Sequence, residues 1–174
     1  MEYFRDDYTK HYIVQALFRL MADYSYEKIS ILDIVKKAGV GRATFYRYFK
    51  SKEDVIKFYF EHNRIQFVFN QHYFPRCKKD YETIAAQALT MFQNNKQLFK
   101  LLKNANLEYL YLEYINANFS ETFSKEYSDR SPYEPYIYAG MLFNVSMKWL
   151  EDDCKEPVES LSKTIVNAIY FEQN

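Results

Sequence analysis

The side chains best suited to bind another molecule gather in one short stretch of this chain. Between Arg42 and Lys52 the strongly apolar residues are Phe45 and Phe49, whose spacing of four places both rings on one side of a helix. The other positions carry guanidinium, hydroxyl, phenol and ammonium groups, on Arg42, Thr44, Tyr46, Arg47, Tyr48 and Lys50. A helix that buries two Phe and exposes these groups can hydrogen-bond to phosphates and to base edges.

Charge is unevenly distributed along the chain. The segment from Lys28 to Lys57 contains eight basic and three acidic residues, a net charge of +5. The whole chain has 23 basic and 23 acidic residues, so the rest of it carries −5. A local positive field on a neutral protein is typical of a surface that meets nucleic acid. A solvated basic face without a partner is the alternative interpretation.

Two short helices and a tight turn must position this stretch. Ser30 is a good N-cap residue, with Asp33 three positions later, where a capping-box acid stands. Apolar residues then recur at helical spacing up to Gly39, which can adopt φ > 0 and reverse the chain. A second helix follows over residues 42–49, and Ser51 caps a third. Two short helices joined by a turn containing Gly predict a helix-turn-helix.

The rest of the chain also has helical patterns. With 3 Gly and 4 Pro among 174 residues, its composition does not suit a turn-rich β protein. We expect an all-α fold of about nine helices, with a helix-turn-helix domain over residues 1–52 and a second helical domain over 53–174, joined through a long helix at 52–73. Helices are predicted over 9–24, 30–38, 42–49, 52–73, 81–93, 95–104, 106–127 and 134–152, with Pro157 in the first turn of the last helix.

Several classes of function are disfavoured. No Gly-rich phosphate loop, G-x-S-x-G or H-E-x-x-H motif occurs, so we expect no catalytic residue and no cofactor. His62 and His72 are badly spaced for chelation on one helix; a metal site of His72 and Cys77 is the alternative to our expectation of no metal. The apolar runs are too short to span a membrane and the N-terminus lacks a signal pattern, which favours the cytoplasm. Cys77 and Cys154 are then expected to be reduced thiols.

The run from Val40 to Asp54 resembles the recognition segment of the TetR family of bacterial transcriptional regulators. It contains T-F-Y-R-Y-F-K-S-K-E, where the family has T-[FL]-Y-x-[HY]-F-x-[SN]-K-[ED]. Gly41 departs from the Ser or Thr that often caps the recognition helix, which removes a side-chain cap. With the recognition helix in the major groove, we expect base contacts from Arg42, Ala43 and Thr44. We expect phosphate contacts from Ser30, Gly41, Tyr46, Arg47, Tyr48 and Lys52.

The last two predicted helices are suited to an interface between two copies of the chain. The helix at 134–152 is apolar on two faces, and residues 139–165 resemble the helix pair through which one TetR subgroup forms homodimers. A homodimer would bind a palindromic double-stranded operator, with half-sites about 34 Å apart or a multiple of that distance. The expected interface residues are Met141, Val145, Trp149, Val158, Leu161, Ile165 and Ile169.

The many aromatic residues raise the question of an effector. The chain has 18 Tyr and 15 Phe, and those between residues 81 and 149 suit an ordinary core as well as a pocket for an apolar ligand. The TetR resemblance implies an effector domain here, and therefore a small molecule of unknown identity. The expected pocket residues are Phe92, Leu102, Tyr109, Tyr111, Tyr114, Tyr138, Leu142 and Trp149.

Together these expectations describe a DNA-binding transcriptional regulator, in most such proteins a repressor, that releases DNA when an effector shifts the long helix. Two alternatives remain at this point. One is a TetR-like co-activator that acts through a protein partner, against which Tyr46, Tyr48 and Lys52 argue. The other is a small helical enzyme or ligand carrier, which the missing catalytic motifs disfavour.

Overall fold

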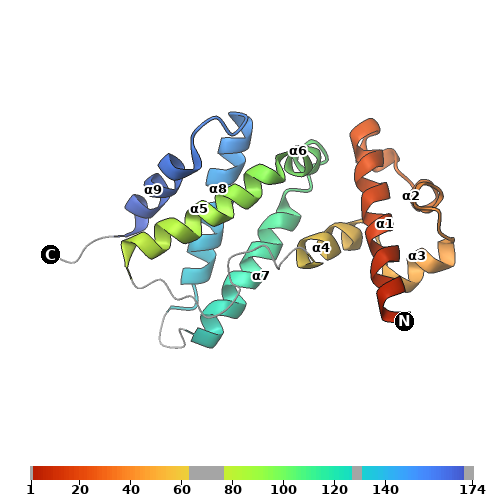
Figure 1. Ribbon diagram of the computed structural model, residues 1–174, viewed down its shortest axis with the longest axis horizontal. Coiled ribbons are helices and arrows are strands. Elements are labelled where there is room, and N and C mark those ends of the chain that lie inside the picture. The colour runs from red at the N-terminus through yellow and green to blue at the C-terminus, as the bar shows by residue number, and fades with distance from the viewer. Residues whose placement is uncertain (1, 63–76, 127–130, 171–174) are drawn as a thin grey trace. The chain divides into compact units, whose positions relative to one another are not determined.

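The computed structural model describes residues 2–62, 77–126 and 131–170 of the chain. All regular structure in these ranges is helical, as predicted (Figure 1). In chain order the helices are α1 (Glu2–Asp23), the 3₁₀-helix η1 (Tyr26–Lys28), α2 (Ile31–Ala38), α3 (Arg42–Tyr48), α4 (Lys52–His62), α5 (Lys78–Asn94), α6 (Lys96–Asn104), α7 (Tyr109–Glu126), α8 (Glu134–Glu151) and α9 (Val158–Ile169). No helix in the described ranges is long and apolar enough to cross a membrane.

Contacts divide the chain into two compact units. The first comprises Met1–His62 together with Lys100–Tyr111, and the second comprises Asn63–Phe99 together with Leu112–Asn174. Each unit is therefore built from two separate stretches of sequence. The predicted continuation of α4 from residue 63 to 73 lies outside the described residues.

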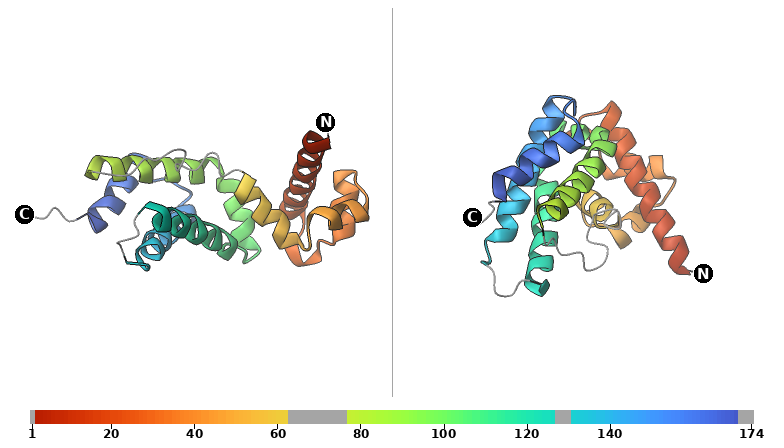
Figure 2. Two further views of the ribbon diagram at one scale, coloured as in Figure 1. Left: turned by 90° about the horizontal axis from the view of Figure 1, so that it is seen from below. Right: turned by 60° about the vertical axis from the view of Figure 1, so that its left-hand side comes forward.

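The first unit is built on α1. Ile13 and Leu17 are completely buried and Met21 is nearly so, as their helical spacing predicts. Both α2 and α4 pack against α1, and α3 packs against α2, an arrangement visible in the two views of Figure 2. The predicted stripe is wrong at Tyr24, which is exposed because α1 ends one residue before it.

The later stretch of the first unit contributes to its core. The rings of Phe60, on α4, and Tyr111, on α7, lie with their centroids 5.7 Å apart, and both side chains are buried. Leu102 and Leu110 of the same later stretch are buried as well. The first unit thus depends on residues that follow α5 in the sequence.

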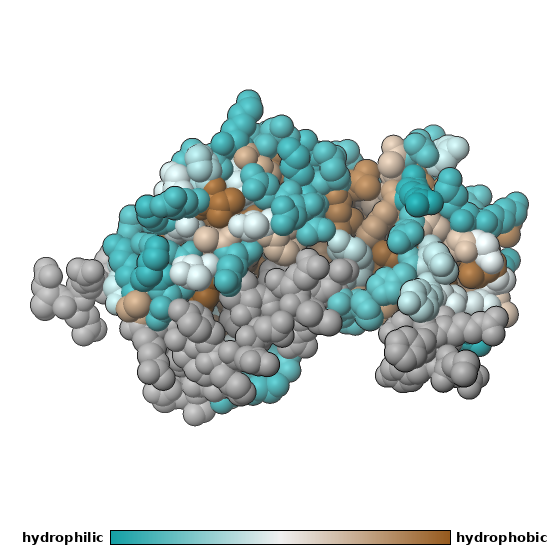
Figure 3. All heavy atoms as spheres, viewed as in Figure 1, coloured by the Kyte–Doolittle hydropathy of each residue, from teal (hydrophilic) through white to brown (hydrophobic). Residues whose placement is uncertain are grey.

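The interior of the second unit is aromatic. Phe92 stacks on Phe99 with ring centroids 4.0 Å apart, and its ring lies 6.4 Å from that of Trp149. Trp149 also donates a hydrogen bond from Nε1 to the carbonyl of Glu156 at 3.0 Å, which holds the corner between α8 and α9. In the same unit α5 and α9 lie side by side (Figure 1). Hydrophilic residues cover most of the described surface on the side seen in Figure 3.

Two helix starts differ from the predictions because of backbone conformation. α7 begins at Tyr109 rather than at residue 106, since Asn106 has a left-handed φ of 54° that no helix can include. Pro157 is the N-cap residue of α9 and not part of its first turn, because its ψ of 138° is extended. Asp153 and Cys154, each with φ of 56°, turn the chain sharply before it.

Candidate DNA-binding surface

The start of α2 is capped by its own side chains. Ser30 Oγ accepts a hydrogen bond from the Asp33 N–H at 3.2 Å and lies 2.6 Å from Asp33 Oδ2, to which it donates. The Ser30 N–H donates to the same carboxylate oxygen at 2.9 Å, which completes the predicted capping box. These hydrogen bonds from Ser30 hold the pKa of Asp33 below its ordinary value. The donors of Ser30 are therefore already engaged with a carboxylate.

Gly39 makes the turn between α2 and α3. It has φ of 69° and ψ of 30°, the left-handed conformation that the sequence predicts. The N–H of Gly39 donates a hydrogen bond to the carbonyl of Lys36 at 3.3 Å. The N–H of Val40 donates to the carbonyl of Val35 at 3.0 Å, and the two bonds together form a Schellman motif. No atom lies within 4 Å of the place where a Cβ on Gly39 would stand. Conformation alone therefore favours glycine here.

α3 has one buried and one exposed face, as its sequence predicts. Phe45 is completely buried and Phe49, just after the helix, is 4% exposed, with their ring centroids 5.8 Å apart. Of the predicted base-reading residues, Arg42 and Ala43 are exposed and Thr44 is half-buried. The aromatic face anchors α3 so that its N-terminal end presents these three side chains together.

Aromatic rings support both arginines of α3. The Arg42 guanidinium lies 5.9 Å from the ring centroid of Tyr46, which stands one helical turn further on. The Arg47 guanidinium lies 4.6 Å from the ring centroid of Tyr48 and also donates a hydrogen bond to its hydroxyl. A stacked arginine has less conformational freedom to lose when it binds a phosphate or a guanine.

Lys10 is a basic residue of this surface that the sequence analysis did not single out. Its ammonium nitrogen lies 5.6 Å from the ring centroid of Tyr48 and 5.4 Å from that of Phe58. Lys10 comes from α1, far from Tyr48 in the sequence, and no local pattern connects the two. The positive surface beside α3 therefore extends onto α1.

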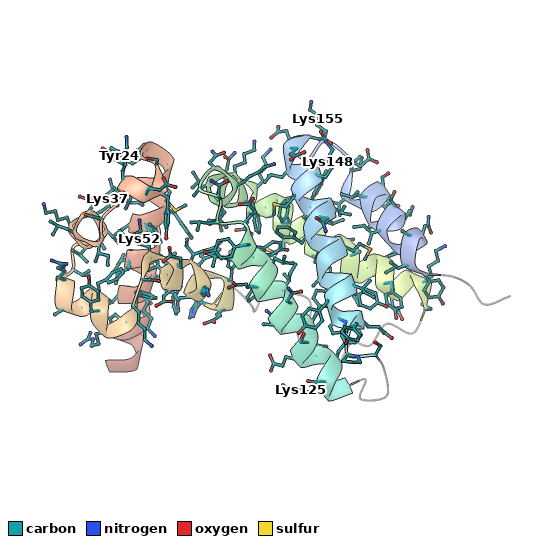
Figure 4. The ribbon with its side chains drawn as sticks, turned by 180° about the vertical axis from the view of Figure 1, so that it is seen from behind. Tyr24, Lys37, Lys52, Lys125, Lys148 and Lys155 are labelled. Atoms are coloured by element: carbon teal, nitrogen blue, oxygen red, sulfur yellow. The ribbon has the colours of Figure 1, made fainter. Side chains whose placement is uncertain are left out.

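Lys52 has partners inside the first unit. Its ammonium group donates hydrogen bonds to the carbonyls of Tyr26, at 2.7 Å, and Ile29, at 2.8 Å, and lies 3.9 Å from the centroid of the Tyr26 ring. The Tyr26 hydroxyl donates to Glu53 Oε1 at 2.8 Å. We call Tyr26, Ile29, Lys52 and Glu53 the Lys52 cluster; Figure 4 labels Lys52 at the beginning of α4.

Within the Lys52 cluster, Tyr26 favours its protonated form and Glu53 favours its ionised form. Burial raises the pKa of the Tyr26 phenol, and its hydrogen bond to Glu53 raises it further. Burial also opposes ionisation of Glu53, but the hydrogen bonds that its carboxylate accepts, first that of Tyr26, outweigh burial and hold its pKa below the ordinary value. The phenol is therefore the donor and the carboxylate the acceptor across a wide range of pH.

The comparison with known proteins bears directly on this geometry. Residues 13–57 match the sequence profile of the bacterial regulatory proteins of the tetR family. This segment of the first unit is therefore of the TetR type. The resemblance predicted from the run Val40 to Asp54 is thereby confirmed, and the matched residues extend from Ile13 in α1 to Lys57 in α4.

Individual relatives define how far the likeness reaches. DhaS of Lactococcus lactis, an HTH-type transcriptional activator of the dhaKLM operon, is 36% identical over 55 residues, which are 32% of this chain and 29% of DhaS. The sequence match thus spans less than a third of that curated relative. The structure of Lin0861 from Listeria innocua covers 95% of this chain and 91% of its own, with a TM-score of 0.79 at 23% identity. The structure of the transcriptional regulator FadR from Bacillus subtilis, in complex with stearoyl-CoA, covers 90% of this chain and 95% of its own. Its TM-score is 0.53 at 19% identity. The two structures show a shared fold.

The predicted effector-pocket residues are divided between the two units. Tyr109 is 45% exposed, whereas Phe92, Leu102 and Tyr111 are completely buried. A pocket lined by these residues stays a prediction. The predicted pocket residues of the first unit are Leu102, Tyr109 and Tyr111. The predicted pocket residues of the second unit are Phe92, Tyr114, Tyr138, Leu142 and Trp149.

Two predicted dimer-interface residues prove to be core residues of a single chain. Trp149 is 3% exposed and Ile165 is 5% exposed, because they pack inside the second unit. Side chains so deeply covered within one chain have almost no surface left for a second copy. The other five, which are half-buried, keep their place in the prediction: Met141, Val145, Val158, Leu161 and Ile169. Three exposed residues at the start of α8 were not predicted: Tyr133, Tyr136 and Ile137.

The metal and thiol predictions concern residues away from this surface. Across the described residues, no three His, Cys, Asp or Glu side chains are placed to hold a metal ion. Cys77 is exposed and Cys154 is buried, and both are thiols, as predicted. The alternative metal site of His72 and Cys77 involves His72, which lies outside the described residues.

Proposed function

We propose that this protein is a sequence-specific DNA-binding regulator of transcription whose α3 enters the major groove. The exposed N-terminal end of α3 carries the proposal, because Arg42 and Ala43 are presented to solvent by a helix fixed through the buried Phe45. The net charge of +5 between Lys28 and Lys57 supplies the field that attracts DNA. The TetR-type match of this unit supports the same role.

Arg42 is the proposed reader of a guanine. Its guanidinium can donate to O6 and N7 of that base, while the methyl groups of Ala43 and Thr44 suit the methyl group of a thymine. Tyr46 lies under Arg42 and restricts the directions in which it can reach. The sequence preference should therefore be strongest at the base pair that Arg42 meets.

Phosphates are the proposed partners of the side chains around these readers. Tyr46, Arg47 and Tyr48 and the backbone of Gly41 would hold the DNA backbone and fix the register of α3, with Lys10 as an added cation. At Ser30 a phosphate would compete with the Asp33 carboxylate for the same donors.

A homodimer that binds a palindromic operator is proposed for the whole protein. It would be built on α8 and α9, which carry the five half-buried residues named above, and Tyr133, Tyr136 and Ile137 expose further apolar surface at the start of α8. Sedimentation of the wild type, Leu161→Glu and Ser160→Glu tests this. We expect the wild type and Ser160→Glu to be dimers and Leu161→Glu to be a monomer, because Leu161 is half-buried whereas the neighbouring Ser160 is exposed. A monomeric wild type would contradict the proposal.

The proposed effector is an apolar small molecule bound by the second unit. The interior of the second unit is aromatic, since the ring of Phe92 lies against those of Phe99 and Trp149. FadR, which shares the fold, is known in complex with stearoyl-CoA. Such a ligand would release a repressor from its operator by shifting α4. DhaS is a transcriptional activator, which supports activation as the second candidate outcome of DNA binding.

Selection from random-sequence duplexes tests the DNA-binding proposal. The wild type should enrich a palindromic sequence, and Arg42→Ala should lose preference at one position in each half-site, by about 1–3 kcal/mol. Arg47→Ala should instead weaken binding to all duplexes evenly and lower the salt slope by about one. Failure of the wild type to enrich any sequence would favour the co-activator alternative. Identical losses in the two variants would contradict the division into base and phosphate contacts.

A further inference from the structure

We propose that Lys52 is a positioning residue that ties the beginning of α4 to the chain leading into α2, rather than a phosphate contact. Through this tie it would set the place of the α2–α3 pair, and the inference rests on the proposed DNA-binding function. The Lys52 cluster lies wholly within the first unit and spans η1, the loop before α2 and the start of α4.

The ammonium group of Lys52 has little capacity left for an external anion. A lysine has three N–H donors, and two of these are used at 2.7 and 2.8 Å by the carbonyls of Tyr26 and Ile29. The ring of Tyr26 lies 3.9 Å from the nitrogen and provides a cation–π contact on another side. The residue is half-buried. Charge-assisted hydrogen bonds of this length are stronger than neutral ones, so a phosphate would have to replace good partners.

Lys52 and its neighbour Glu53 hold Tyr26 at both ends. Lys52 binds the backbone carbonyl of Tyr26, while Glu53 accepts a hydrogen bond from the phenol at the tip of the same side chain. Tyr26 is 8% exposed, so the ring between these two points is also packed. Hydrogen bonds at the backbone and at the side-chain tip of one residue oppose both sliding and rotation of η1 against α4.

The second carbonyl partner carries this restraint into α2. Ile29 is 3% exposed and directly precedes Ser30, the N-cap residue of α2. The Ile29 N–H also bonds to the carbonyl of Tyr26 at 3.2 Å, which joins the two acceptors of Lys52 to each other. Because α3 packs against α2, a displacement of the start of α4 would move the base-reading helix through this route.

Salt dependence separates a positioning residue from a phosphate contact. Each phosphate that a protein neutralises adds about 0.9 to the slope of log K against log salt. Lys52→Met keeps the aliphatic stem but removes the charge and all donors, and Arg47→Met removes a proposed phosphate contact from the exposed face of α3. On a duplex enriched by the wild type, we expect Lys52→Met to lower affinity about tenfold with an unchanged slope. Arg47→Met should lower the slope by about one.

Amide hydrogen exchange tests the tie without DNA. In Lys52→Met the amides of Lys28 and Ile29, which bond to the carbonyls of Ser25 and Tyr26, should exchange at least about tenfold faster than in the wild type. In Arg47→Met their rates should not change. If Lys52→Met does not fold, Lys52→Gln, which removes the charge and keeps a donor, gives the same comparison.

Two results would each overturn the proposal. One is a slope that falls by about one in Lys52→Met, which would make Lys52 a phosphate contact. The other is unchanged exchange at Lys28 and Ile29, which would show that the hydrogen bonds of Lys52 restrain nothing. If the wild type enriches no duplex, the proposed function fails, and the exchange measurement still decides whether the tie exists.

Discussion

The two glycines beside the turn of the helix-turn-helix differ in conformation, and substituting each should have opposite effects. Gly39 has φ of 69° with nothing within 4 Å of the position that an added Cβ would take, so Gly39→Ala adds no clash and only holds an L-residue in the left-handed region. That conformation costs about 1–2 kcal/mol, from which about 0.4–1 kcal/mol is recovered because Ala lowers the entropy of the unfolded chain. We expect a net loss of about 1 kcal/mol in the free energy of unfolding.

Gly41 is the matched case. Its φ is −81° and the nearest atom to an added Cβ is Thr44 Oγ1 at 3.9 Å, so a side chain fits without strain. Gly41→Ser also supplies the missing N-cap oxygen of α3, and together with the unfolded-state effect this should raise the free energy of unfolding by about 0.5–1 kcal/mol. The two variants should therefore differ by about 1.5–2 kcal/mol.

Urea unfolding followed by circular dichroism measures this difference. The chain's one Trp, Trp149, lies in the second unit, so its fluorescence shows whether that unit unfolds in the same transition. Gly39→Asn is a control, since Asn tolerates the left-handed region better than Ala and should lose less stability. Equal losses in Gly39→Ala and Gly41→Ser would refute an explanation based on φ.

Three other side chains provide further tests. Phe45→Ala should lower the free energy of unfolding by about 3–5 kcal/mol in the same urea assay, because the ring is completely buried, whereas Phe45→Leu should lose much less. The raised pKa of Tyr26 stabilises the fold fully below about pH 10, the value in the unfolded chain, and this contribution is lost as the pH rises above it. Thermal unfolding across this range should therefore show a steeper loss in the wild type than in Tyr26→Phe, and parallel curves would contradict the assignment. Ile165→Glu should place a carboxylate in the core of the second unit and lower the midpoint seen by Trp149 fluorescence, while Asn167→Glu, at an exposed position, should change it little.

The helix-turn-helix could be predicted from the sequence because its determinants are local. The Ser30–Asp33 capping box, the left-handed Gly39 and the spacing of Phe45 and Phe49 each depend on residues within a few positions of one another. Contacts across the chain had no such signal. Nothing in the sequence near Lys52 distinguishes an ammonium group that meets two backbone carbonyls from one that meets a phosphate.

The second unit shows the limit of an apolar stripe as a predictor. The pattern through Trp149 and Ile165 correctly indicates that these side chains are buried, but it does not say by what. A helix of the same chain and a helix of a second copy demand the same periodicity, so the stripe does not distinguish a core residue from an interface residue. The late start of α7 was missed because periodicity does not report the left-handed φ of Asn106.

During synthesis, the first unit cannot close its core until Tyr111 has left the ribosome. Phe60 lies in α4, and it meets the ring of Tyr111 only after the whole of α5 has been made. At roughly 5–20 residues per second, that wait lasts a few seconds, far longer than a helix needs to form. A fragment ending at His62 would carry every proposed DNA contact and still lack the ring contact between Phe60 and Tyr111. The core of the first unit is therefore completed only after most of the chain has been translated.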